Sequence, residues 1–399
     1  MKLLEFKKEK EEFVKKELNK KKVIGTIIVI IMIIIIMIIT SLYVTNIKVR
    51  DVIDLYILRK NVTESSLNSI EINEENNPSI FAYSNSLVVL EKNILTKYNS
   101  SGKKEGELKI EVNNPIFEMN DNYLIIAEKG KNKVYLVHNG SIVWEKDLEG
   151  NISKISVNKN GFTSIILTGT TYKSVIIVFD KTGKELFKTY LSSTIAIDST
   201  ISEDNKYLSF AEINTTGTIV QSTIKTVSIE KASKSPTDSI IATYNSEEDD
   251  LIINIKYQEK TRLACMYNNS IRLLQLDKDE MLINLNEKNK KYTFADVELN
   301  NYVYGVSEKS VGLFKSNSVV EIYNTSTKKQ NIYNFNGVAK KIYSKDSIIA
   351  IDLGTEIHFI GMNGWLIKKY ISSQEIKNII LADGLAGIVY RDRLEFITL

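Results

Sequence analysis

Residues 117–126 read Phe117-Glu118-Met119-Asn120-Asp121-Asn122-Tyr123-Leu124-Ile125-Ile126, a short β-run, a polar turn and a second β-run. Residues 81–90 repeat the pattern as Phe81-Ala82-Tyr83-Ser84-Asn85-Ser86-Leu87-Val88-Val89-Leu90. Short runs of β-branched and aromatic residues around a polar turn are typical of antiparallel hairpins. No long 3.6-residue periodicity interrupts this pattern from about residue 79 onward. The sequence therefore predicts an all-β domain made of repeated hairpins.

The spacing of these turns indicates the number of repeats. Asn85 to Asn122 is 37 residues, Asn122 to Asn160 is 38, Asn160 to Asn205 is 45, and Asp346 to Asp383 is again 37. The 141 residues from Asn205 to Asp346 fit three intervals, with turns expected near Lys260 and Asn300. Eight turns result, and eight repeats are preferred to seven. The stretch 292–316 leaves a count of seven repeats open as the alternative, because Ser316-Asn317-Ser318 also resembles a turn of this type.

The second half of each unit repeats as well. A strand, a turn with glycine and a further strand recur in residues 134–146, 176–188 and 357–367. Each unit thus reads as four antiparallel strands, the size and pattern of a β-propeller blade. The last unit has room for three strands only, so residues 66–72 are the candidate for a closing fourth strand.

One strand–turn segment, Asp180-Lys181-Thr182-Gly183-Lys184-Glu185-Leu186-Phe187-Lys188, resembles the repeat of quinoprotein-like (PQQ-like, WD40-like) propellers. Over residues 20–399 the arrangement resembles uncharacterised single-span bacterial proteins with an extracytoplasmic propeller. The resemblance implies a blade architecture and no catalytic positions. Enzymatic quinoproteins require a cofactor pocket with bound Ca²⁺ and acidic ligands, and no such residues can be placed here, so no cofactor is expected.

An isoleucine-rich stretch without charges runs from Val23 to Val44. As a helix its 22 residues would extend about 33 Å, enough to cross a bilayer core of about 30 Å. The competing interpretation is a cleaved signal peptide, whose apolar region is usually shorter and ends in small residues. No alanine occurs in this stretch, which favours an uncleaved anchor in the lipid bilayer.

The charges around this stretch predict its orientation. Residues 1–22 hold nine Lys and five Glu, whereas Lys48 and Arg50 are the nearby cations on the other side, so the N-terminus is expected in the cytoplasm. Tyr43 would lie at the far interface. The expected organisation is a cytoplasmic basic tail (1–22), a transmembrane signal-anchor helix (23–44), a stalk or linker (45–78) and an extracytoplasmic propeller (79–399). The tail could be a solvated topology signal, or an amphipathic helix that contacts lipid or a partner.

Composition excludes some functions. After residue 22 the chain has 43 basic and 44 acidic side chains, a net charge of −1, so it lacks the excess of basic residues expected for nucleic-acid binding. The single cysteine, Cys265, cannot form an internal disulfide, and its apolar neighbours predict a buried, inert thiol.

The sequence predicts no catalytic, cofactor-binding or metal-binding residues. Asp277 to Met281 begins like a Ca²⁺ loop but lacks its third ligand and glycine, so a turn between strands is preferred. Glu247 to Asp250 is interpreted as a solvated loop, and Gly169 to Ser174 as a hairpin connection rather than a phosphate loop. His138 and His358 occupy equivalent positions in third strands of separate units, which makes a shared metal site improbable.

Two functions remain open. The first is a non-enzymatic binding or scaffold module for an envelope protein or cell-wall component. The alternative is an extracytoplasmic enzyme or sensor that uses a small ligand in the propeller channel. Convergence of acidic or polar side chains from several blades at one end of the channel would favour the second.

Overall fold

The computed structural model describes residues 20–58, 60–63, 67–217, 220–235, 239–247, 250–275, 278–310 and 316–399. It consists of two compact units, residues 1–59 and residues 60–399. The first 19 residues, to which most of the expected cytoplasmic tail belongs, lie outside the described range.

The first unit is helical. It contains α1 (Lys20–Thr45), α2 (Ile47–Val52) and a π-helical turn, η1 (Ile53–Ile57). Between Ile24 and Thr45 the helix is long and apolar enough to cross a membrane. The Tyr43 hydroxyl donates a 2.8 Å hydrogen bond to Asp54 Oδ1, which links the end of α1 to η1. Tyr43 therefore has a polar partner within the same unit.

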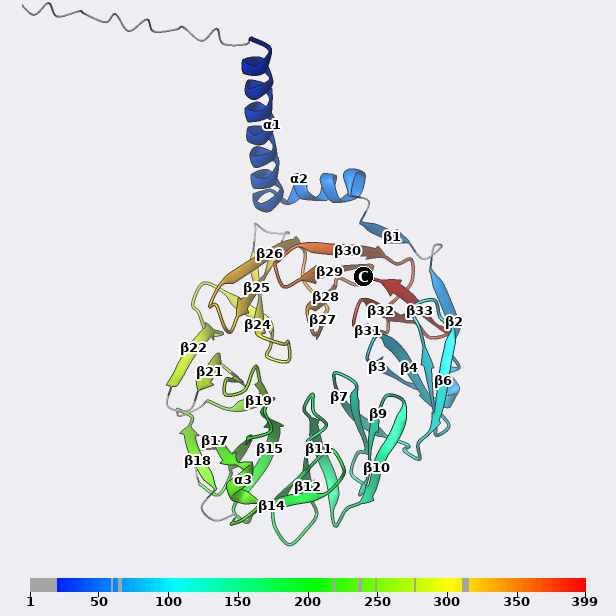
Figure 1. The fold of residues 1–399 in the computed structure, drawn as a ribbon, viewed down its shortest axis with the longest axis vertical. Coiled ribbons are helices and arrows are strands. Elements are labelled where there is room, and N and C mark those ends of the chain that lie inside the picture. The colour runs from blue at the N-terminus through cyan, green and yellow to red at the C-terminus, as the bar shows by residue number, and fades with distance from the viewer. Residues whose placement is uncertain are drawn as a thin grey trace, which may run out of the picture. The chain divides into compact units, whose positions relative to one another are not determined.

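The second unit is an eight-bladed β-propeller with four antiparallel strands in each blade, as the repeat predicts (Figure 1). Blade 1 contains β3 (Ser79–Tyr83), β4 (Ser86–Glu91), β5 (Ile94–Tyr98) and β6 (Lys104–Lys109). Blade 2 contains β7 (Pro115–Asn120), β8 (Tyr123–Glu128), β9 (Lys133–His138) and β10 (Ser141–Asp147). Blade 3 contains β11 (Asn151–Val157), β12 (Thr163–Thr168), β13 (Ser174–Phe179) and β14 (Glu185–Leu191). Blade 4 contains β15 (Thr194–Ile201), β16 (Tyr207–Asn214), β17 (Gln221–Ser228) and β18 (Ile240–Asn245), with α3 (Ile229–Ala232) before β18.

The remaining blades follow the same plan. Blade 5 contains β19 (Ile252–Tyr257), β20 (Leu263–Tyr267), β21 (Ser270–Gln275) and β22 (Lys278–Asn284). Blade 6 contains β23 (Lys291–Asp296), β24 (Tyr302–Ser310), β25 (Ser316–Asn324) and β26 (Gln330–Asn336). Blade 7 contains β27 (Lys341–Lys345), β28 (Ile348–Asp352), β29 (Glu356–Gly361) and β30 (Leu366–Ile371). Residues 316–318 therefore begin a strand rather than form a turn. The turn that follows the first strand of blade 6 is the one predicted near Asn300.

Closure uses chain from both ends of the unit. Blade 8 contains β31 (Asn378–Ala382), β32 (Leu385–Val389) and β33 (Arg393–Thr398). Its fourth strand is β2 (Asn68–Glu71), which pairs antiparallel with β33 and places Ile70 opposite Leu394. A further strand, β1 (Asn61–Thr63), adds in parallel to β30. A 3₁₀ turn, η3 (Glu74–Asn76), follows β2. Strand β2 lies within residues 66–72 and confirms the predicted closing strand, whereas β1 lies in a segment expected as a connection. The propeller unit therefore begins ahead of residue 79.

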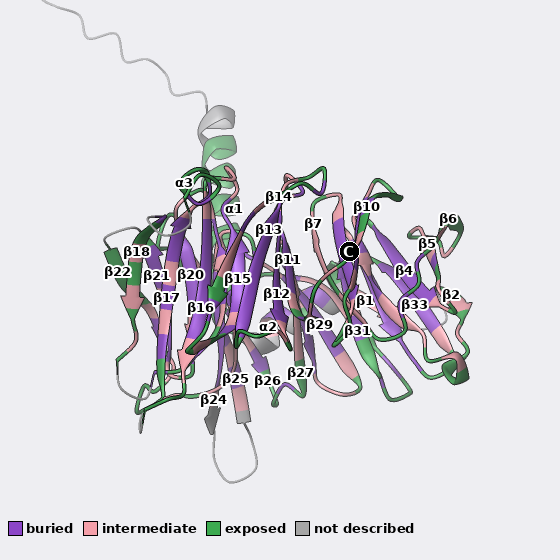
Figure 2. Ribbon diagram, turned by 90° about the horizontal axis from the view of Figure 1, so that it is seen from below, coloured by how far each residue is buried: buried purple, intermediate pink, exposed green. Residues whose placement is uncertain are grey.

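The core lies between the blades. In β8, Ile125 packs into a cluster shared with blade 3, whereas the flanking Leu124 and Ile126 pack into a cluster shared with blade 1. Middle strands are therefore buried on both faces, as Figure 2 shows for β12, β13 and β20. Because a blade has no core of its own, its apolar side chains are buried only by packing against the two neighbouring blades.

Candidate functional site

The first strand of every blade lines the central channel, and the turn that follows this strand lies at one mouth of it (Figure 1). A cavity of about 460 Å³ at this mouth is lined by residues of all eight blades. One lining residue from each blade, in order, is Ser84, Asp121, Lys159, Glu203, Lys256, Asn301, Asp346 and Asp383. Turns of seven of the repeats, together with the end of β19 in blade 5, therefore assemble into one surface, which we call the mouth.

Amide side chains brace adjacent turns of the mouth. Asn158 donates from Nδ2 to the Ser202 carbonyl oxygen at 3.0 Å and to Asn205 Oδ1 at 2.6 Å, which joins blades 3 and 4. Asn300 donates to Asp346 Oδ1 at 3.2 Å, which joins blades 6 and 7. Asparagine is also suited to the left-handed conformation in such turns, as Asn205 and Asn301 with φ of 60° illustrate. The polar residues that identified the repeat thus also hold the mouth in shape.

A second cavity of about 440 Å³ lies deeper in the channel and shares Met119, Asn120, Lys256, Asn300 and Asp346 with the mouth. Charged residues on the first strands of blades 2 to 7, or immediately after them, alternate in sign around the channel, and those of blades 2, 5, 6 and 7 line this cavity. We call these seven residues the charged ring: Glu118, Lys154, Asp198, Lys256, Asp296 with Glu298, and Lys345.

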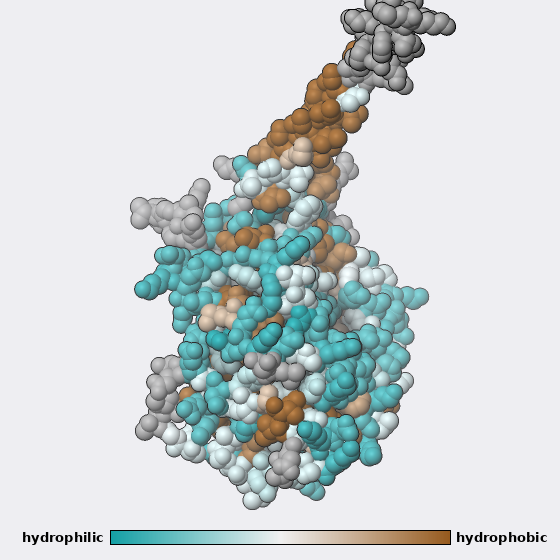
Figure 3. All heavy atoms as spheres, turned by 60° about the vertical axis from the view of Figure 1, so that its left-hand side comes forward, coloured by the Kyte–Doolittle hydropathy of each residue, from teal (hydrophilic) through white to brown (hydrophobic). Residues whose placement is uncertain are grey.

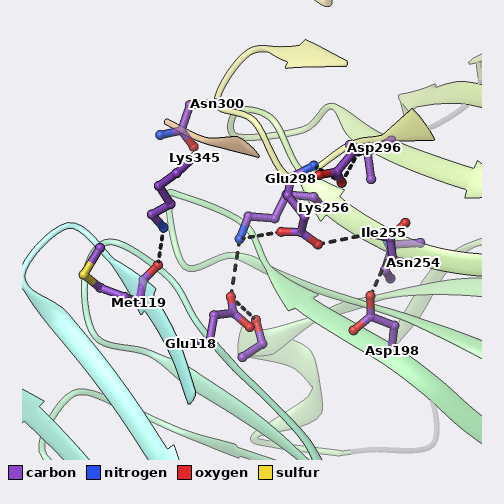
Figure 4. A network of polar contacts seen from close by, with 12 residues as sticks. Glu118, Met119, Asp198, Asn254, Ile255, Lys256, Asp296, Glu298, Asn300 and Lys345 are labelled. Atoms are coloured by element: carbon purple, nitrogen blue, oxygen red, sulfur yellow. Dashed lines mark hydrogen bonds and ion pairs between the residues drawn. The ribbon is translucent and has the colours of Figure 1, made fainter. Parts of the chain in front are cut away.

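Lys256 joins two carboxylates from different blades (Figure 4). Its Nζ lies 3.3 Å from Glu118 Oε1 and 3.5 Å from Glu298 Oε2. Burial alone would lower the pKa of Lys256, but the two carboxylates more than offset it and the pKa is raised. Lys256 is therefore a permanent cation at neutral pH, unsuited to act as a base or a nucleophile.

The Lys154–Asp198 pair occupies blades 3 and 4. Lys154 Nζ lies 3.3 Å from Asp198 Oδ1, and Asp198 Oδ2 accepts a 3.0 Å hydrogen bond from the Ile255 backbone N–H. Burial raises the pKa of Asp198 to about 6, even though Lys154 and this N–H oppose the shift. Asp198 is 3% exposed, so its carboxylate links blades 4 and 5 rather than facing a ligand.

Asp296 is held by three donors. Its Oδ1 accepts from the backbone N–H groups of Val297 and Glu298 at 2.7 and 3.0 Å, and its Oδ2 accepts from Ser344 Oγ at 2.7 Å. Burial raises the pKa of Asp296, with the Glu298 carboxylate adding to the shift. This carboxylate joins blade 6 to blade 7.

Lys345 differs from the other two lysines of the ring. Its Nζ donates to the Met119 carbonyl oxygen of blade 2 at 3.2 Å (Figure 4). Among the described residues no carboxylate lies within 4.0 Å of it, whereas Lys154 and Lys256 each have at least one. Burial lowers the pKa of Lys345; Asp346 opposes this shift and Lys256 adds to it.

The residues singled out in the sequence lie elsewhere. His138 stacks on Tyr123 in blade 2, whereas His358 in blade 7 shares a 2.9 Å hydrogen bond between Nδ1 and the Tyr333 hydroxyl. The two histidines are on third strands of different blades, as predicted. No group of three or more potential metal ligands occurs in the described part of the chain. Cys265 is fully buried in β20, and burial raises the pKa of its thiol.

Three loop interpretations have different outcomes. Residues 169–173 connect β12 to β13, as predicted, and Ser174 begins β13. Glu247 and Asp250 lie in a loop between β18 and β19, but only Glu247 is exposed; Asp250 is buried, so the solvated-loop interpretation is wrong for it. Glu248 and Asp249 are outside the described residues. The turn expected over Asp277 to Met281 is wrong for its described part, because residues 278–281 belong to β22 and Asp279 pairs with Arg272 Nε at 2.7 Å. Asp277 itself is outside the described range.

The charged ring was missed in the sequence, although a signal is present. Glu118, Lys154, Asp198 and Lys256 each interrupt a first strand that is otherwise mainly apolar. A charge at this position in successive repeats indicates a shared environment, which the channel then provides.

Comparison with protein families identifies the chain as a member of a family of unknown function (DUF5711), whose model matches residues 58–399. No curated protein matches it. Among solved structures, BamB from Moraxella catarrhalis aligns with a TM-score of 0.47 and 11% identity, covering 84% of this chain and 100% of that chain. Sqt1 from Chaetomium thermophilum aligns with a TM-score of 0.49 and 11% identity, with the same two coverages of 84% and 100%. The propeller assignment itself rests on the strand pairing above.

Proposed function

We propose that this member of the DUF5711 family is a single-pass membrane protein whose extracytoplasmic propeller is a non-enzymatic binding module. Its partner is an envelope protein or a cell-wall component, and the docking surface is the mouth. The observation that carries the proposal is the contribution of all eight blades to one polar cavity there. A surface to which all eight blades contribute offers many contacts without any need to order a loop on binding.

The exposed apolar surface of α1 supports the membrane anchor. Side chains from Ile27 to Ile39 are between 45% and 61% exposed, and Figure 3 shows one face of this apolar surface in brown. Water would penalise such a surface, whereas a hydrocarbon core would solvate it. The lysines at positions 20–22 precede the apolar segment and support a cytoplasmic N-terminus.

The chemistry of the charged ring favours binding over catalysis. Lys154, Lys256, Asp198 and Asp296 all have partners that hold blades together, and Lys256 stays protonated. The Ser344 hydroxyl does donate to Asp296 Oδ2 at 2.7 Å, but two backbone N–H groups also bind this carboxylate, and the contact joins blades 6 and 7. Charged side chains do converge from several blades, which is compatible with a ligand-sensing role. Because most of them pair with one another, they hold neighbouring blades together rather than act as catalytic groups.

The placement of the propeller can be tested with thiol chemistry. Cys265 is the only cysteine and is fully buried, so the native chain has a low labelling background. We expect Asp383→Cys at the mouth to react with a membrane-impermeant maleimide in intact cells. Lys7→Cys in the tail should react only after lysis. Labelling of the tail variant in intact cells would contradict the proposed orientation.

The docking surface can be tested by site-specific photocrosslinking in intact cells with the full chain. A photoreactive residue at Asp121 or Asp383 is expected to capture one discrete partner. The matched control is Glu107, which is exposed on the outer strand β6 of blade 1. Equal capture from Glu107, or none from either mouth position, would refute the mouth as the docking surface.

A further inference from the structure

The inner cavity has two chemically different walls. Phe81, Phe117 and Ile380 form an apolar wall from blades 1, 2 and 8, with Phe81 and Phe117 stacked at 4.1 Å between ring centroids. Phe117 is 41% exposed, which is unusual for a large aromatic side chain on the first strand of a blade. The opposite wall carries members of the charged ring from blades 5, 6 and 7. A compound that fills this space would therefore need both an apolar part and charged groups.

Direct contacts between charged groups in this cavity are uneven: within the described residues Lys345 interacts with Asp346, Glu118 and Glu298 only beyond 4.0 Å, whereas Lys256 contacts two carboxylates directly. Lys345 has one backbone carbonyl for three ammonium hydrogens, which leaves donor capacity directed at the cavity that it lines. Lys256 in turn has two carboxylates, Glu118 and Glu298, so this group of three carries a net charge of −1. The two unbalanced charges flank the same short segment of β7, because Glu118 bonds to Lys256 and the adjacent Met119 bonds to Lys345.

We propose that the inner cavity binds a small zwitterion with an apolar side chain, an amino acid or a short peptide. Its carboxylate pairs with Lys345, its ammonium group lies toward Glu118 and Glu298, and its apolar part packs on Phe117 and Ile380. The mouth is the entry route, since the two cavities share five residues. The ligand would supply each unbalanced charge with its missing partner, and a cavity of about 440 Å³ is within the usual range for small-molecule sites.

The burial of Lys345 is consistent with this role. A partly buried ammonium group without a carboxylate partner is destabilising for the free protein, since hydration lost on folding is not replaced. Such a cost is tolerated where a ligand later provides the counter-charge, because functional sites often break the rules that hold for the rest of a fold.

This small-molecule site goes beyond the proposed docking function and is tested separately, with the full chain in detergent micelles. Isothermal titration with leucine and phenylalanine, in both L and D forms, is expected to show binding of at least one of them. N-acetyl-leucine lacks the ammonium group and leucinamide lacks the carboxylate. Each should bind at least about tenfold more weakly than leucine, the loss expected for one charge-assisted hydrogen bond.

Two variants assign the carboxylate contact. Lys345→Met should abolish the difference between leucine and leucinamide, and it should leave the melting temperature of the ligand-free protein unchanged or higher. Lys341→Met is the matched control, because Lys341 lies on the same strand β27 but is exposed. It should bind leucine as the native chain does.

Three outcomes would overturn the inference: no binding of any zwitterion, equal binding of the charge-deleted analogues, or a Lys345→Met variant that behaves like Lys341→Met. A marked fall in the melting temperature of ligand-free Lys345→Met would identify Lys345 as a structural tie between blades instead. Photocrosslinking from Asp383 does not depend on Lys345. Partner capture that persists while these titrations fail would reject the zwitterion site and leave the proposed docking function standing.

Discussion

Lys256 and Glu118 are 138 residues apart in the chain, yet their side chains form a 3.3 Å ion pair between blades 5 and 2. The contact spans the channel, and no local segment of sequence contains both partners. With Glu298 at 3.5 Å from the same ammonium group, it connects three blades that share no strand pairing.

Replacing Lys256 by Met should destabilise the propeller, because Glu118 and Glu298 would then face each other without a counter-charge. Loss of one partner of a buried pair costs about 3 kcal/mol, and the side chain is only 15% exposed. Urea denaturation of the native and variant chains measures the difference. Adding Glu118→Gln to the variant should recover part of the loss. A double variant no more stable than Lys256→Met alone would show that carboxylate repulsion is not the cause.

The pH dependence of stability should contain a contribution from Asp198. Its pKa of about 6 in the folded chain exceeds the unfolded value of 3.8, so the folded state binds the proton more tightly between these values. Stability contributed by this group is therefore lost as the pH rises from about 4 to about 6, on the order of 2 kcal/mol. Asp198→Asn should lack this loss. Denaturation midpoints of the native and variant chains between pH 4 and pH 7 test this prediction. The same dependence of the midpoint on pH in both chains would contradict the raised pKa of Asp198.

Gly183 and Gly140 allow a matched test of packing between blades. Both have positive φ, +82° and +77°, but a Cβ on Gly183 would lie 2.8 Å from Trp144 Cγ, whereas one on Gly140 would meet nothing within 4 Å. Alanine at either position costs backbone strain of about 1 kcal/mol. Gly183→Ala should cost about 1–3 kcal/mol more, since it also overpacks the contact with Trp144. Equal losses of stability for the two variants on thermal unfolding would show that Trp144 moves aside at no energetic cost.

The closing strand should be required for full stability of the propeller. Ile70 of β2 packs into the core between blades 8 and 1, so Ile70→Asp would place a charge in an apolar contact. We expect a loss of about 2–3 kcal/mol. Asn68→Asp introduces the same side chain at an exposed position of the same strand and should be nearly neutral. Similar unfolding curves for both variants would argue against a stabilising role for β2.

The anchor prediction concerns residues 24–45. Replacing Ile33 and Ile34 together by Arg adds about 5–7 kcal/mol to the cost of insertion, because each Arg near the centre of a span costs about 2.5–3.5 kcal/mol. We expect this variant to be extracted from membranes by alkaline carbonate, and the native chain to stay in the pellet. Ile33→Leu with Ile34→Leu is the control. Extraction of the native chain by alkaline carbonate would contradict the proposal that this segment is a membrane anchor.

The sequence by itself determined what depends on nearby residues. Turn residues such as Asn122 and Asp383 act within one hairpin, and the isoleucine-rich segment from residue 24 is helical and apolar through its own composition. Repetition of one hairpin at regular spacing then limited the all-β domain to a propeller, and the eight-turn count agrees with the eight blades. The same local patterns placed Cys265 in a buried strand and His138 and His358 on third strands.

Only the tertiary structure decided which side chains meet in the channel. Glu118, Lys256 and Glu298 lie on three separate repeats, and their proximity depends on how many blades close the ring and how far each first strand reaches along the axis. The parallel strand β1 was missed for the same reason, since the three residues Asn61, Val62 and Thr63 acquire strand structure only against the edge of β30. Turn residues determine the structure of each blade, whereas closure of the ring determines which side chains meet in the channel. Charged residues distant in sequence acquire partners only once the last blade pairs with β2.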